Sequence, residues 1–193
     1  MAASDLPAAA AWRHHTARDG FETVFFSERP DGWVLQGHTT AVEDGVAWAI
    51  RYDIITDLAW RTRTAHIWSQ SASGLHELVL ESDGAGHWHV DGARTPQLDD
   101  CFDVDLESSA CTNALPVHRC ELPVGVRVDE PALWVRAPTL EVQRLEQTYE
   151  RVEGDGDRQR FDYRSPAFGF EALLTFDAAG LVVEYPGLAS RVL

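Results

Sequence analysis

The stretch that decides the fold is DGAGHWHVDGARTPQLDDCFDVDLESSACTNALPVHRCEL, residues 83–122. It opens with two tight-turn signals, Asp83-Gly84 and Asp91-Gly92, which flank a short strand pattern. Residues 102–106 then alternate apolar side chains with aspartates, as in a strand whose two faces are used differently. A helix signal follows, so the stretch predicts a β-rich chain wrapped around one short helix, which suits binding better than catalysis.

The helix signal lies between residues 108 and 125. Serines at 108–109 and the pair Thr112-Asn113 can cap a helix, and Pro116 fits a first turn, where its missing N–H costs nothing. Gly125 is expected to end the helix after about two to three turns. A helix this short is marginal in water, so the sheet must pack around it.

Period-two alternation continues outward on both sides of this stretch. It is clear over residues 46–54 and 170–176, and over 60–68, where Trp60, Thr62, Thr64, His66 and Trp68 are expected to share one face. Together with the turn sequences between them, these patterns predict roughly a dozen or more short antiparallel strands. The further strands are expected at 21–27, 33–42, 75–82, 87–90, 126–129, 133–137, 140–151, 160–164 and 181–185.

The 193 residues fit a single domain over 1–193 or a tight internal duplication. The sequence ELVLES is followed by the turn at residues 83–86, and EALLTF is followed by a similar turn at residues 177–180. Good hairpin turns resemble one another, so this echo is compatible both with chance and with two related β-halves.

Composition narrows the class of partner. The net charge is −15, from 31 acids against 16 bases that are all arginine, which argues against nucleic acid and against anionic lipid surfaces. There is no apolar run of about 20 residues and no secretory signal at the start, so we expect a cytoplasmic protein without a membrane span. Cys101, Cys111 and Cys120 lack the short spacing of a zinc pair, and we interpret them as buried small side chains.

Asp103 and Asp105 carry the most chemical information. On one strand face they would lie roughly 6.5–7 Å apart. This spacing is compatible with the acid and base of a glycosidase, or, with the acids at 99–100, with a divalent cation site. The competing interpretation is a strand face that is either solvated or paired with arginine, and Arg61 and Arg63 could form an ion-pair ladder with these acids.

Other catalytic or metal motifs are weak. His87 and His89 would share a strand face, but no third zinc ligand lies nearby in the sequence. Ser108, Ser109 and His118 lack the G-x-S-x-G context of a hydrolase nucleophile, and there is no glycine-rich nucleotide motif. We therefore expect no metal and no cofactor.

Four further residues are candidates for ligand contacts. Asn113 can cap the helix or make a polar contact, and Arg119 can pair with the aspartates at 103 and 105 or reach a phosphate or sugar hydroxyl. Trp88 offers a flat ring for stacking. Tyr185 can end a strand or close the rim of a pocket.

Four motifs in the chain resemble those of the bacterial putative glycolipid-binding family. The family's patterns are D-G-x-G-x-W-x-x-D-G, C-x-D-V-D-L, T-N-x-L-P-[IV]-x-R and D-x-x-G-L-V-x-x-Y-P-G, and the likeness spans about residues 35–191. The matching residues are Asp83, Gly84, Gly86, Trp88, Asp91, Gly92, Cys101, Asp103, Val104, Asp105, Leu106, Thr112, Asn113, Leu115, Pro116, Val117, Arg119, Asp177, Gly180, Leu181, Val182, Tyr185, Pro186 and Gly187. This chain departs from the pattern at Asp100, where glycine is common, and at Ala114, where threonine is common.

The resemblance implies a spiral β-roll: a long antiparallel sheet wrapped around a single helix. It also implies homodimers and a structural likeness to bacterial lipoprotein carriers. No catalytic residues come with it.

The main functional hypothesis is therefore binding of a glycolipid or other amphipathic molecule in a cleft between sheet and helix, without catalysis. The ligand-binding candidates are Arg61, Arg63, Trp88, Asp103, Asp105, Asn113, Arg119 and Tyr185. Two alternatives stay open: an enzyme that acts on a sugar or lipid-like substrate with Asp103 and Asp105, and a structural or regulatory homodimer without a pocket.

Overall fold

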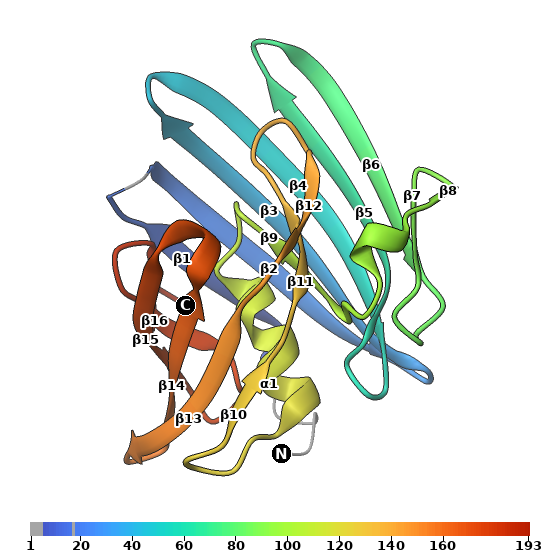
Figure 1. Ribbon diagram of the computed structural model, residues 1–193. Helices are drawn as coiled ribbons and strands as arrows, with labels where there is room; N and C mark the ends of the chain where they lie inside the picture. The colour runs from blue at the N-terminus through green and yellow to red at the C-terminus, as the bar shows by residue number, and fades with distance from the viewer. Residues whose placement is uncertain (1–5, 17) are drawn as a thin grey trace.

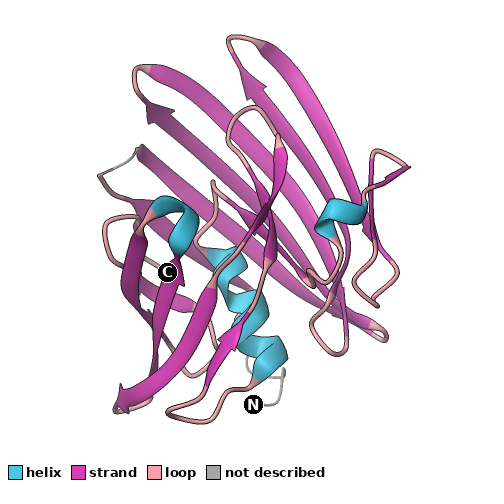
Figure 2. Cartoon of the chain, viewed as in Figure 1, coloured by secondary structure: helices cyan, strands magenta, loops and turns pink. Residues whose placement is uncertain are grey.

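The computed structural model describes residues 6–16 and 18–193. Regular structure in this part is mostly β, in one 14-stranded sheet and one three-stranded sheet, with the short helix α1 (Ala114–Cys120) between them (Figure 2). The strands of the large sheet are β1 (Ala9–His14), β2 (Asp19–Arg29), β3 (Gly32–Glu43), β4 (Val46–Asp57), β5 (Thr62–Ser71), β6 (Gly74–Ser82), β7 (Trp88–Val90), β8 (Ala93–Arg94), β10 (Arg127–Asp129), β13 (Thr148–Asp155), β14 (Arg158–Ser165), β15 (Phe170–Phe176), β16 (Val182–Tyr185) and β17 (Ala189–Arg191). The small sheet contains β9 (Asp103–Leu106), β11 (Ala132–Val135) and β12 (Val142–Leu145).

The large sheet is antiparallel at every pairing and runs in the order β10-β13-β14-β15-β16-β17-β1-β2-β3-β4-β5-β6-β7-β8. Because Trp12 of β1 pairs with Arg191 of β17 on one side and with Glu22 of β2 on the other, the two ends of the chain join in mid-sheet. The sheet curls around α1, and its terminal strands β10 and β8 do not pair, so it stays open (Figure 1). The predicted fold, a long antiparallel sheet rolled around one short helix, is confirmed.

The small sheet lies across the mouth of this roll, in front of the long strands (Figure 1). In it, β9 pairs in parallel with β11, so that Asp105 lies opposite Trp134. β11 pairs antiparallel with β12. The stretch that decided the fold thus supplies both the edge of this sheet and the helix behind it.

Alternation predicts the buried face well where the register is regular. On β4, Trp48, Ile50, Tyr52 and Ile54 are all at most 4% exposed. On β5 the predicted face is wrong from Thr64 onward. A register shift follows Ile55 on the neighbouring strand, so Ala65, Ile67 and Ser69 point into the core, and His66 and Trp68 lie on the outer face. One irregular residue exchanges the two faces of a strand because the side-chain period is two.

Three strands were not predicted, namely β1, β8 and β17, which are short or rich in alanine. The strand expected at 140–151 is two strands, β12 and β13, interrupted at residues 146–147. The remaining predicted strands coincide with observed ones apart from their ends.

The helix begins differently from the prediction. A 3-10 turn, Cys111–Asn113, leads directly into α1, and Asn113 has helical backbone angles and no side-chain capping bond. Glu22 of β2 takes over the capping role: its carboxylate accepts hydrogen bonds from the backbone N–H of Ala110 at 2.8 Å and of Cys111 at 3.3 Å. Partners this far apart in sequence are not visible in a local capping pattern.

Glu22 is fully buried and has further donors, the hydroxyl of Tyr52 at 2.6 Å and that of Ser109. Burial raises its pKa, and the four hydrogen bonds act in the opposite direction. At the other end, α1 stops at Cys120 and not at Gly125, because Glu121 adopts a left-handed conformation with φ of 43°.

Two hydrophobic clusters hold α1 in place. Leu115 belongs to a large cluster with the inner faces of β3, β4 and β5, whereas Val117 belongs to a second cluster with Tyr149 and Phe161 from β13 and β14. The helix thus packs against β3–β5 on one side and against β13 and β14 on the other. This packing positions the start of α1, and the loop before it, against the mouth of the sheet.

Candidate functional site

The strongest candidate site is a pocket of about 440 Å³ between the start of α1, the small sheet and strands β14–β16, which we call the α1 pocket. Its size lies within the range of about 300–1,000 Å³ typical of small-molecule sites. Its lining residues are Arg18, Glu43, Asp105, Leu106, Glu107, Ser109, Asn113, Trp134, Arg136, Leu145, Tyr163, Ser165, Phe168, Phe170, Tyr185 and Leu188.

One side of the α1 pocket is aromatic. Trp134 of β11 meets Phe168 edge-on, with ring centroids 5.0 Å apart, and Phe168 is 55% exposed. Tyr185 of β16 lies 5.9 Å from Phe170 and 6.1 Å from Tyr163, measured between ring centroids. Flat rings at a pocket rim can stack on a sugar or cover an acyl chain.

The polar side of the pocket contains Asp105 and Asn113. Asp105 accepts a hydrogen bond from the hydroxyl of Thr112 at 3.3 Å and lies partly buried on β9. Burial, with smaller contributions from the charges of Glu107 and Asp103, raises its pKa from 3.8 to about 7. Near neutral pH this carboxyl group therefore exchanges between an acceptor and a donor form.

Asn113 is a structural anchor on the pocket wall. Its Oδ1 accepts a hydrogen bond from the hydroxyl of Tyr149 at 2.9 Å, and its side chain is almost fully buried. This contact ties the start of α1 to β13. Its remaining donor, Nδ2, makes a long contact of 3.5 Å with the carbonyl oxygen of Ala110.

Arg18 and Glu107 form the polar edge of the pocket. Arg18 is 7% exposed; it donates to the carbonyl oxygen of Glu107 at 3.1 Å and lies 3.6 Å from the carboxylate of Glu43. Its guanidinium also packs over Trp48, 5.3 Å from the ring centroid. Burial raises the pKa of Glu107, whose carboxylate accepts the N–H of Ala137 at 2.8 Å.

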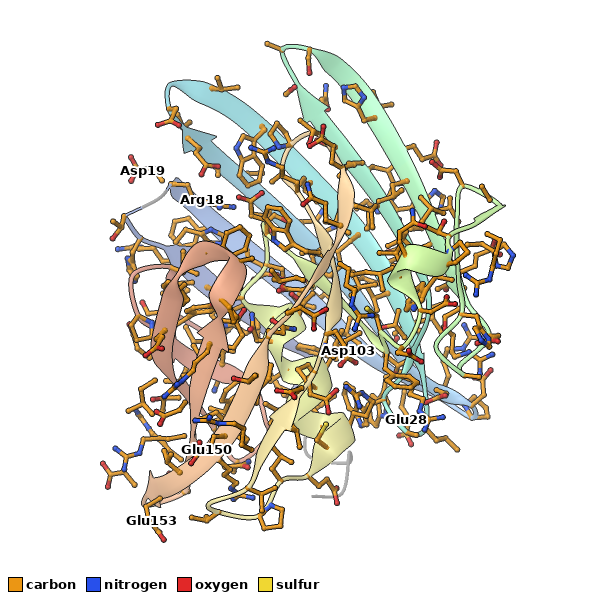
Figure 3. All side chains as sticks on the ribbon, in the orientation of Figure 1. Arg18, Asp19, Glu28, Asp103, Glu150 and Glu153 are labelled. Atoms are coloured by element: carbon orange, nitrogen blue, oxygen red, sulfur yellow. The ribbon has the colours of Figure 1, made fainter. Side chains whose placement is uncertain are left out.

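Three of the eight candidate residues meet here: Asp105, Asn113 and Tyr185. Asp103 and Arg119 lie outside the pocket in a buried ion-pair network, joined at 2.6 Å, and Arg119 also contacts Glu130 (Figure 3 labels Asp103). Since only one of the two aspartates lines the α1 pocket, Asp103 and Asp105 do not form the pair of catalytic carboxylates that the glycosidase hypothesis requires.

Arg61, Arg63 and Trp88 also lie outside the α1 pocket. Arg61 donates to the carbonyl oxygen of Gly84 at 3.1 Å, and Arg63 donates to that of Ser82 at 3.3 Å, so both brace the β6–β7 turn. The ladder expected between these arginines and the aspartates of β9 is therefore wrong. Trp88 is fully buried, and its indole N–H donates to the carbonyl oxygen of Cys101 at 2.9 Å.

Sequence reasoning missed the residues that make most of the pocket, among them Arg18, Trp134 and Phe168. Trp134 lies in the predicted strand at 133–137, and its ring is as suitable for stacking as that of Trp88, which was the candidate instead. Arg18 and Phe168 lie in connecting segments, and their proximity depends on how the sheet curls.

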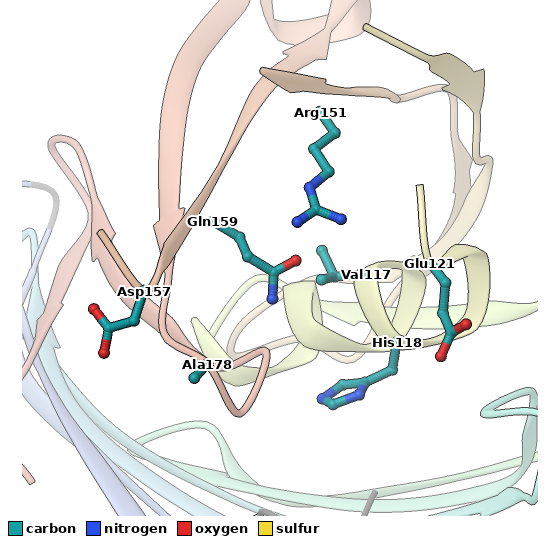
Figure 4. A pocket seen from close by; sticks show the side chains of 7 residues that line it. All are labelled: Val117, His118, Glu121, Arg151, Asp157, Gln159 and Ala178. Atoms are coloured by element: carbon teal, nitrogen blue, oxygen red, sulfur yellow. The ribbon is translucent and has the colours of Figure 1, made fainter. Parts of the chain in front are cut away.

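A second pocket, of about 360 Å³, lies at the other end of α1 (Figure 4). Arg151 and Gln159 point into it from β13 and β14, and His118 borders it from the helix. The ring of His118 is stacked on Trp60 at 3.9 Å, and burial lowers its pKa to about 4. Among the described residues, the only ring that lines this pocket is that of His118, whereas five aromatic side chains line the α1 pocket, so this pocket is the weaker site for an amphipathic ligand.

The described residues contain no group of three or more His, Cys, Asp or Glu side chains placed to hold a metal ion. His87 is instead paired with Asp83 at 2.6 Å. Cys101, Cys111 and Cys120 are free thiols, the first two of them buried. No helix in the described ranges is long and apolar enough to cross a membrane.

The model of the family described as "Putative glycolipid-binding" matches residues 9–191. The chain belongs to this family. A search of curated proteins finds no match. Among solved structures, a DUF1089 family protein from Pseudomonas aeruginosa is 31% identical, with a TM-score of 0.78 over 94% of this chain and 95% of that one. A beta-barrel-like protein with a domain of unknown function, DUF1849, from Brucella abortus has a TM-score of 0.51 at 9% identity over 96% and 94% of the two chains, and this likeness concerns the fold alone.

Proposed function

We propose that this protein binds an amphipathic small molecule, a glycolipid, in the α1 pocket and performs no chemistry on it. The observation that carries the proposal is the division of the pocket into an aromatic side, with Trp134, Phe168 and Tyr185, and a polar side, with Asp105 and Arg18. An acyl chain would lie against the rings and Leu188, and the headgroup would meet the polar edge. The family description agrees with a ligand of this type.

Two aspects of the geometry favour binding, one over catalysis and one over a purely structural homodimer. Asp105 has a pKa near neutrality, but Asp103 is held by Arg119 away from the pocket. A pocket is also present, which the hypothesis of a purely structural homodimer did not expect. Dimerisation and a cytoplasmic location stay predictions from the sequence.

The test is native mass spectrometry of gently purified protein, followed by lipid extraction, with one blocking variant and one control. Leu188→Trp places a large ring in the pocket, whereas Leu75→Trp adds the same ring at a position that is 70% exposed and outside it. We expect an amphiphile to co-purify with the wild type and with Leu75→Trp, and to be lost from Leu188→Trp. A protein that carries no amphiphile and binds none from a panel of added glycolipids would overturn the proposal.

A further inference from the structure

The charges around the α1 pocket are unequal. Three acids, Glu43, Asp105 and Glu107, line it together with two arginines, Arg18 and Arg136. The formal balance of these five groups is 2 − 3 = −1 when all are charged. The nature of the headgroup therefore depends on whether the two arginines are available to a ligand.

Both arginines are already engaged by acids of the protein. Arg18 lies 3.6 Å from the Glu43 carboxylate and 3.8 Å from that of Glu107, and it donates to the Glu107 carbonyl oxygen at 3.1 Å. Arg136 lies 3.4 Å from the carboxylate of Glu141, in a pair that is about half exposed to solvent. Arg18 therefore does not offer the free bidentate fork with which arginine recognises phosphate or carboxylate, and water screens the charge of the half-exposed Arg136.

Asp105 keeps more free hydrogen-bonding capacity than Arg18. Within the described residues, Asp105 accepts only the Thr112 hydroxyl, at 3.3 Å, although a carboxylate has about four acceptor sites. A sugar hydroxyl can donate to such a group, whereas a phosphate would bring a second negative charge into a partly buried space.

We propose, on the basis of the function proposed above, that the α1 pocket selects headgroups that carry hydroxyls and no negative charge, and that Asp105 is the residue that excludes anions. Many glycolipids carry phosphate or acidic groups, so this selectivity would exclude part of that class of ligand. Specificity then rests on a single side chain on β9.

Calorimetric titration with two amphiphiles of equal tail length, octyl glucoside and octyl phosphate, tests the inference below their micellar concentrations. Wild-type protein is expected to bind octyl glucoside at least about tenfold more tightly at pH 8, where Asp105 is mostly charged. Asp105→Asn keeps the shape of the side chain and is expected to reduce this ratio about tenfold. Glu28→Gln, a change at an exposed acid outside the pocket (Figure 3), should leave the ratio unchanged.

The outcomes separate the two proposals. Octyl phosphate binding as tightly as octyl glucoside to wild-type protein overturns the inference but leaves the pocket a binding site. A wild-type preference that Asp105→Asn does not alter overturns the role of Asp105. Binding of neither amphiphile overturns the proposed function, and the inference with it. Because the wild-type comparison needs no substitution, poor folding of Asp105→Asn would not remove the test.

Discussion

Replacing Arg119 by Met is expected to cost stability but not ligand binding. Arg119 is joined to Asp103 at 2.6 Å, and the two side chains are 12% and 2% exposed. Met preserves part of the packing against Phe102, whose ring centroid is 5.2 Å from the guanidinium, but it leaves Asp103 and Glu130 without their shared cation.

Removing one partner of a buried ion pair typically costs about 3–5 kcal/mol, because the other charge remains buried and uncompensated. In a domain of this size, each kcal/mol lowers the melting temperature by roughly 2–4 °C, so we expect a decrease on the order of 10 °C. Adding Asp103→Asn removes much of the stranded charge. The double variant should therefore be more stable than the sum of the two single changes implies, by about 1–3 kcal/mol.

Urea unfolding followed by circular dichroism measures these stabilities, and calorimetry with octyl glucoside measures binding where each variant is fully folded. If Arg119→Met lost less than about 1 kcal/mol, the network would not be the buried ion pair that the geometry indicates. Weaker binding at unchanged stability would place Arg119 in the ligand site and contradict the assignment of the pocket.

Three further predictions concern the helix, the pocket and the sheet. Because folding raises the pKa of Asp105 from 3.8 to about 7, this group makes the free energy of unfolding fall as pH rises from about 4 to about 7. Asp105→Asn should therefore make the stability measured by urea unfolding less dependent on pH over that range, and an unchanged pH dependence would contradict the raised pKa. Tyr149→Phe removes the 2.9 Å bond to Asn113 and leaves its oxygen unpaired, which should cost about 1–3 kcal/mol in urea unfolding; a neutral result would mean that α1 is not tied to β13 through this bond. Gly37→Ala would place a methyl group 1.9 Å from the ring of the fully buried Tyr52, so we expect at least about 3 kcal/mol of destabilisation or loss of soluble protein. The control Gly45→Ala, in open space at φ of +77°, should cost only about 1 kcal/mol in thermal melting.

The fold could be predicted from local pattern because the alternation of apolar and polar residues in a strand indicates which of its faces is buried. Trp48, Ile50 and Tyr52 alternate with smaller or polar residues, and that periodicity is a property of the strand itself. The helix was located correctly from Pro116 and the residues around it, but its cap was not. Glu22 lies almost ninety residues before the N–H groups it binds, and no local rule connects them.

The site was harder to predict for the same reason. Asp103 was a candidate because of its spacing from Asp105, and Arg119 because it could pair with these aspartates or reach a ligand. In the structure Arg119 pairs with Asp103, outside the pocket. The pocket instead depends on side chains from β9, β11, β14 and β16 that meet only after the sheet has curled. Register shifts such as the one after Ile55 are equally invisible to periodicity, yet they decide which ring faces inward.

The pairing of β1 with β17 has a consequence for how the molecule is made. Strands β2 to β6 are joined by successive hairpins and can assemble in order as they leave the ribosome, because each partner is a sequence neighbour. Trp12 of β1 cannot pair with Arg191 until β17 has been synthesised. Tyr185 and Leu188, which line the pocket, directly precede β17 in the chain. The α1 pocket is therefore incomplete until residues 185–191 have left the ribosome, so no ligand can occupy it before they are synthesised.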